Sequence, residues 1–235
     1  MKKSKNILNI GLTLIALLMI FSCENRDSTD LPPSIAVYQD LLVRYQTNTK
    51  NTLAKATFRT LDKNGTRLVL KGESKILFNN KKYDKFSTIF DYFYEWKEKE
   101  LIDVEFNYVK NKTISFKNKI SFKEASTIEI PTSFNKVKLD GTTKLKWKGS
   151  PLQKNEEITI SFHQGDKGAT GGVKGVDKGN EEISIDGLFI KGMKKGKAIL
   201  RLIRSKELEG IQQSDGKNNG RRTVEVEVTK EVIVE

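Results

Sequence analysis

The residues that most often carry catalysis are scarce in this chain of 235 residues. His163 is the single histidine and Cys23 the single cysteine, so no zinc site built from several histidines can form. Adjacent glutamates such as Glu156 and Glu157 point to opposite faces of a strand and cannot share one proton-transfer site. We therefore expect no catalytic residues, no metal and no cofactor. Two acids from distant loops, or a triad around His163, are the enzymatic arrangements that the sequence leaves open.

A glycine-rich segment, residues 165–180, carries Lys167, Lys174 and Lys178. It does not match a phosphate-binding P-loop, because it lacks a Gly-Lys pair followed by Ser or Thr and a helix. We expect either a mobile hairpin loop or a loop that binds a partner or an anionic glycan. A second expected loop, residues 212–220, would form a joint site with it if both lay at the same end of one domain.

An aromatic run includes Tyr92, Tyr94 and Trp96, which share one face of an extended strand. Rings in such a row more often pack in a core or between domains, which is our first interpretation. The second is an exposed platform on which sugar rings stack. The exposure of the rings distinguishes the two.

Apolar and polar residues alternate over most of the chain, as in Val104, Phe106 and Tyr108. This period-two pattern predicts an all-β protein of short strands joined by polar turns. Pro131 cannot lie in a central strand, so we divide the body there into β-sandwich domains 34–130 and 131–235. The strand pattern of the second half resembles bacterial Ig-like domains. This resemblance implies two Ig-like sandwiches in tandem.

Residues 1–22 have the layout of a cleavable secretory signal, with a basic start and an apolar run from Ile7 to Phe21. The run ends in Ile20-Phe21-Ser22-Cys23, which resembles the lipobox of bacterial lipoproteins, although Phe21 stands where that family usually has a small residue. The resemblance implies cleavage before Cys23 and lipid on its thiol, which would attach the protein to membrane lipid. Residues 23–33 are polar, end in two prolines and predict a short flexible tether. Their acidic residues resemble the export signals of surface lipoproteins of the Bacteroidota.

The net charge of +12 is spread along the chain. Lysines alternate with apolar residues, as on the solvent face of half-buried strands, whereas nucleic-acid-binding proteins usually concentrate their positive charge. We expect no nucleic-acid partner. The expected function is that of a lipid-anchored, non-enzymatic binding or structural module of the cell envelope, at the outer membrane, for a protein partner or adhesion target. The alternative is a glycan-binding accessory lipoprotein of a polysaccharide uptake system.

Overall fold

The computed structural model describes residues 25–88, 92–165, 167–175, 178–217 and 219–235, and for 167–175 it describes the backbone alone. Strands dominate this part of the chain, which confirms the predicted all-β class. Helical structure within these ranges is limited to short 3-10 turns, and no described helix is long and apolar enough to cross a membrane. In chain order the elements are β1 (Asn25–Asp27), η2 (Ser28–Asp30), β2 (Val37–Gln46), β3 (Asn51–Thr60), β4 (Arg67–Val69), β5 (Lys75–Phe78), β6 (Lys85–Ser87), β7 (Phe93–Glu98), β8 (Val104–Val109), β9 (Ser115–Ile120), η3 (Phe122–Glu124), β10 (Lys136–Val137), β11 (Thr142–Lys146), β12 (Glu156–Gln164), β13 (Lys167–Gly175), β14 (Glu182–Asp186), η4 (Gly187–Ile190), β15 (Gly196–Glu207) and β16 (Gly220–Val234).

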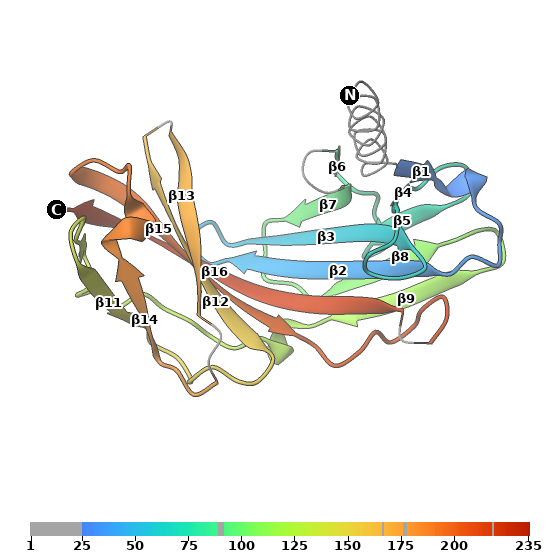
Figure 1. Ribbon diagram of the computed structural model, residues 1–235. Helices are drawn as coiled ribbons and strands as arrows, with labels where there is room; N and C mark the ends of the chain where they lie inside the picture. The colour runs from blue at the N-terminus through green and yellow to red at the C-terminus, as the bar shows by residue number, and fades with distance from the viewer. Residues whose placement is uncertain (1–24, 89–91, 166, 176–177, 218) are drawn as a thin grey trace, which may run out of the picture.

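One large sheet runs through the whole body in the order β1-β4-β3-β2-β16-β15-β12-β13 (Figure 1). Strand β7 also pairs with β3, β6 pairs with β7, and β10 pairs with β16. The centre of the sheet is β16, which is 15 residues long. It pairs antiparallel with β15 through twelve residue pairs and parallel with β2 through eight. A single strand therefore links the N-terminal and C-terminal parts of the chain.

Two smaller sheets each cover one part of the large sheet and enclose a hydrophobic core. The sheet β5-β8-β9 closes the N-terminal core, which includes Leu41, Phe58 and Phe106. The pair β11-β14 closes the C-terminal core, which includes Leu145 and Phe162. Full burial of one such side chain stabilises the fold by roughly 1.5–3 kcal/mol, so each core accounts for much of the stability of its part.

The predicted division at residue 131 is crossed by the large sheet. Strand β16 belongs to the second half of the sequence, yet its pairing with β2 completes the sheet of the first half. Its side chains also serve both cores: Val224 packs in the N-terminal core, whereas Val228 and Val232 pack in the C-terminal core. The ranges 34–130 and 131–235 thus share one sheet, and each core takes residues from both ranges, Ile128 in the C-terminal core and Val224 in the N-terminal core. The number of independent domains, and their Ig-like character, stay predictions.

The predicted tether is folded against the body from Asn25 onward. Strand β1 pairs in parallel with β4 through three residue pairs. The Lys71 Nζ atom lies 2.6 Å from Asp27 Oδ2, and the Lys71 backbone N–H donates to the Ser28 hydroxyl at 2.8 Å. The expectation of a flexible tether is therefore wrong for this segment, because its polar groups bond to the edge of the sheet in place of water.

A buried ion pair joins β12 and β15 where the two parts of the body meet. Arg204 donates to the Glu156 carboxylate, and both side chains are almost fully buried. Arg204 also donates to the carbonyls of Thr127, Ser150 and Pro151. The pair thereby fixes the segment that connects the two parts of the chain to the large sheet.

Candidate functional site

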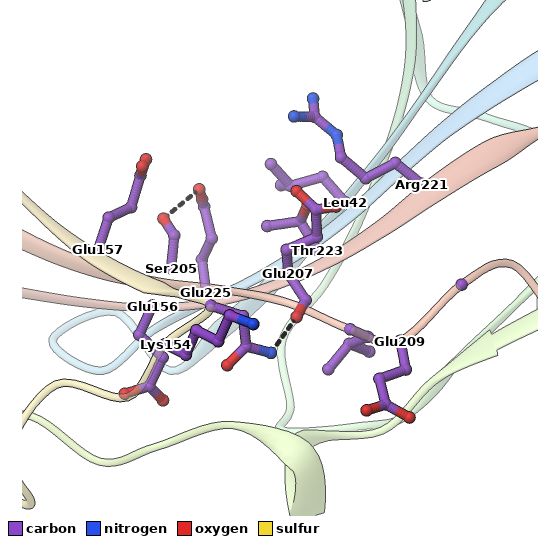
Figure 2. Close-up of a pocket in the computed structure, with 13 residues that line it drawn as sticks. Leu42, Lys154, Glu156, Glu157, Ser205, Glu207, Glu209, Arg221, Thr223 and Glu225 are labelled. Carbon is purple, nitrogen blue, oxygen red and sulfur yellow. Dashed lines mark hydrogen bonds between the residues drawn. The ribbon is translucent and has the colours of Figure 1, made fainter. Parts of the chain in front are cut away.

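A groove of about 860 Å³ lies on the large sheet at the junction of the two parts (Figure 2). Strands β2, β12, β15 and β16 contribute to it, together with the residues just before β12 and just after β15. The charged residues that line it are Lys154, Glu156, Glu157, Glu207, Glu209, Arg221 and Glu225. These are five glutamates against one lysine and one arginine, and two of the glutamates, Glu156 and Glu225, form ion pairs with Arg204 and Arg44 from outside the lining.

Strand alternation explains why these side chains gather on one face. Ser205 pairs with Glu225 across β15 and β16, and Glu207 pairs with Thr223. Since successive residues of a strand point to opposite faces, the intervening Val224 points into the N-terminal core. The groove therefore lies on the face of β16 opposite to the cores.

Glu156 and Glu157 point to opposite faces of the sheet, as predicted for adjacent residues of a strand. Figure 2 shows Glu157 pointing to one side of the sheet and Glu156 to the other. Burial alone would raise the pKa of the Glu156 carboxyl, but hydrogen bonds from Arg204, from Ser126 and from the Gln153 backbone hold it below its usual value. The Glu156 carboxylate is thus part of the framework beneath the groove.

Arginines hold the glutamates on the floor of the sheet in place. Glu225 accepts from Arg44 Nε at 2.5 Å and from the Ser205 hydroxyl at 2.8 Å. Two residues further along the same face, Glu227 accepts from Arg201 at 2.5 Å. Because these carboxylates are tied to neighbouring strands, the floor of the groove has a fixed charge pattern.

At the rim, Arg221 makes two hydrogen bonds to Asp40, at 3.2 and 2.6 Å. The hydrogen bond to Asp40 raises the pKa of the Arg221 guanidinium, and the negative potential of Glu207 acts in the same direction. Glu207 and Glu209 are both exposed, Glu207 as the last residue of β15 and Glu209 two residues beyond it. The open part of the groove is therefore its acidic part.

His163, around which the sequence left a catalytic triad open, is not among the residues that line the groove. His163 lies on β12 away from the lining residues and pairs with Ile199 across the sheet. Among the residues that the structure describes, no group of three His, Cys, Asp or Glu side chains could hold a metal ion.

The aromatic candidates contribute mainly to the N-terminal core. Tyr94 is 2% exposed and Trp96 is 3% exposed, so neither ring is available as a face for stacking. Both rings therefore pack in the core, as in our first interpretation, and the candidate binding role of Tyr94 and Trp96 is wrong. The reason is that the β5-β8-β9 sheet covers the face of β7 that carries them. Tyr92 is half-buried at the start of β7 and bonds to Asn25.

The glycine-rich segment is a strand for most of its length. Residues 167–175 form β13, which pairs antiparallel with β12, so the expectation of a loop is wrong there. The side chains of Lys167 and Lys174 lie outside the described part of the structure, and Lys178 is exposed in the turn that follows. Cys23, the candidate lipidation residue, also lies outside the described residues.

The two glycine-containing segments do not form a joint site. The 212–220 segment lies at the end of the body near β9, far from β13 (Figure 1). Asn118 Oδ1 accepts from the backbone N–H groups of Gln212 and Gln213, both at 2.9 Å. Asp215 lies 2.5 Å from Lys110 Nζ. Polar side chains thus hold this segment where a mobile loop was expected.

Sequence reasoning missed the groove because its residues come from four strands far apart in the chain. Alternating Glu and Val residues in β16 did indicate a strand with one charged face. Only the pairing of β16 with β2 brings that face beside Asp40 and Arg44. No protein-family model matches the sequence, and no curated protein matches it either.

Proposed function

We propose that this protein is a lipid-anchored, non-enzymatic binding module of the bacterial envelope, and that its partner binds in the acidic groove. The anchor is a lipid on Cys23, as the lipobox-like sequence implies. The partner is another envelope protein that presents a basic segment. The observation that carries the proposal is the pair of exposed carboxylates, Glu207 and Glu209, at the open side of the groove, on a chain whose net charge is positive.

The charge of the groove selects the class of partner. Complementary charges across an interface raise the rate of encounter and exclude partners of the wrong sign. A protein that is basic elsewhere repels a basic segment except at its acidic groove, so the groove both attracts and positions that segment. The exposed carboxylates of Glu207 and Glu209 are the first groups that such a segment meets.

The rigidity of the groove favours binding as well. Its floor consists of paired strands, and the Glu225 carboxylate is already oriented by Arg44 and Ser205. A site that is ordered before binding loses little conformational entropy on association. The groove volume of about 860 Å³ lies in the range of established binding pockets.

The anchor is tested by replacing Cys23 in the full chain. Mass spectrometry of the wild-type protein made in a bacterial host should show acyl groups on Cys23, and the Cys23→Ala variant should leave the membrane fraction. Wild-type protein without acyl groups, or a Cys23→Ala variant that still fractionates with membranes, would refute the anchor.

The groove is tested separately by reversing its exposed charges. Cross-linked partners of the wild type are compared with those of the Glu207→Lys, Glu209→Lys double variant. Glu231→Lys is the control, because Glu231 is an exposed glutamate on β16 outside the groove. We expect the double variant to lose roughly tenfold in partner affinity, since two reversed surface charges together contribute about 1.4 kcal/mol. Equal loss in the control would show that general surface charge, and not the groove, binds the partner.

A further inference from the structure

The folded N-terminal segment places the anchor close to the body. Strand β1 begins at Asn25, and its residues Asn25 and Asp27 pair with Arg67 and Val69 of β4. Cys23 is two residues before Asn25, and each residue of an extended chain spans at most about 3.6 Å. The Cα atom of Cys23, the residue that would carry the lipid, therefore lies within about 7 Å of the Cα atom of Asn25.

Aromatic side chains lie near the start of β1. Tyr92 accepts a hydrogen bond from the Asn25 side chain, and its ring lies 6.1 Å from that of Phe86. Tyr83 is 41% exposed, and its ring lies 4.9 Å from the Tyr94 ring. The Tyr94 hydroxyl in turn accepts from the Leu70 backbone N–H at 2.7 Å, directly after β4. The exposed and half-buried rings thus lie beside the edge of the sheet to which β1 is bound.

Basic side chains accompany the rings. The guanidinium of Arg67 lies 6.0 Å from the centre of the Tyr92 ring. Arg26 on β1 and Lys85 on β6 are exposed. We call the surface formed by Arg26, Arg67, Tyr83, Phe86 and Tyr92 the anchor end. Tyrosines with an apolar ring and a polar tip, and basic residues with long apolar stems, are the side chains that favour the membrane–water interface.

We infer that the anchor end lies directly on the lipid bilayer, with the Tyr83 and Tyr92 rings at the level of the headgroups. This inference rests on the proposed lipid anchor and adds the orientation of the body to it. Because Cys23 precedes β1 by only two residues, the lipid holds this edge of the sheet close to the surface. The C-terminal part, with β11 and β14, then points away from the bilayer at the opposite end of the molecule (Figure 1).

The test attaches the lipid chemically, so that it does not depend on lipidation in the cell. Since Cys23 is the only cysteine, a maleimide phospholipid can be coupled to it alone in the chain that begins at Cys23. The product is placed in vesicles of phosphatidylethanolamine and phosphatidylglycerol that contain a headgroup nitroxide. A fluorophore is attached through an azide-bearing residue at Lys85 in one sample. The matched control carries it at Leu188, which is 77% exposed on η4 in the C-terminal part.

We expect the nitroxide to quench the fluorophore at position 85 several-fold more strongly than the one at 188. Insertion of ten Gly and Ser residues after Glu24 should abolish the difference, because such a linker has an end-to-end distance of roughly 17–19 Å. Equal quenching at 85 and 188 without the insertion would overturn the inference. That result would leave the lipid anchor itself intact, since the anchor is judged by the acyl mass on protein made in cells.

Discussion

The buried ion pair between Arg204 and Glu156 offers the sharpest test of how the body is held together. The Arg204→Met variant keeps a long apolar side chain but removes five hydrogen bonds, which reach Glu156 and the backbone or side chain of three other residues. It also leaves the Glu156 carboxylate buried without its cation. Removing one partner of a buried pair costs about 3–5 kcal/mol, a large share of the stability of about 5–15 kcal/mol of a typical folded protein.

The comparison with a surface pair separates burial from charge. Arg221 also makes two hydrogen bonds to a carboxylate, that of Asp40, but the side chains are 45% and 28% exposed. The Arg221→Met variant should therefore cost only about 0–1 kcal/mol. The double variant Arg204→Met, Glu156→Gln removes both buried charges and should be more stable than Arg204→Met alone, because no buried charge is left without a partner.

Urea unfolding followed by tryptophan fluorescence gives these free energies. Trp96 and Trp147 are 3% and 4% exposed, so both report on unfolding. If Arg204→Met lowered the free energy of unfolding no more than Arg221→Met does, the argument that burial makes the Arg204 pair important would be wrong. A double variant that is less stable than Arg204→Met would contradict the desolvation argument in particular.

Three further predictions concern the same framework. The pKa of Glu156 is lowered in the folded state, so its contribution to stability is present above the usual pKa of 4.5 and is lost as the pH falls through the folded value. In the Glu156→Gln variant, the free energy of unfolding should therefore fall less steeply as the pH is lowered. Burial raises the pKa of Tyr94 to about 12, so the Tyr94→Phe variant should lose one phenol that titrates late in an absorbance titration. The same variant leaves the Leu70 N–H without its acceptor, which should lower the free energy of unfolding in urea by about 1–3 kcal/mol. Because β16 serves both cores, the wild-type chain should unfold in a single urea transition with the same midpoint by tryptophan fluorescence and by far-ultraviolet circular dichroism, and two separate midpoints would show that the cores unfold independently.

The all-β class could be predicted because it depends on local alternation. Val104, Phe106 and Tyr108 are buried in β8 while the residues between them are half-buried, as the period-two pattern indicates. The same reasoning placed Glu156 and Glu157 on opposite sides of their strand. Each of these conclusions needs only the geometry of one strand.

The failures arise where long-range pairing decides the structure. The segment from Asn25 resembles a tether in composition, yet the edge of β4 supplies partners for its backbone. The glycine-rich segment at 167–175 has few side chains typical of strands, yet β12 provides the ladder against which it pairs. The groove escaped prediction for the same reason, since the parallel pairing of β16 with β2 has no local signal in the sequence.

The position of β16 also determines when the fold can be completed. It follows every other strand in the sequence, yet it lies at the centre of the large sheet and contributes to both cores. Neither core can be completed before β16 has paired with β2 and β15, so the joining of segments far apart in the sequence is a late step in folding.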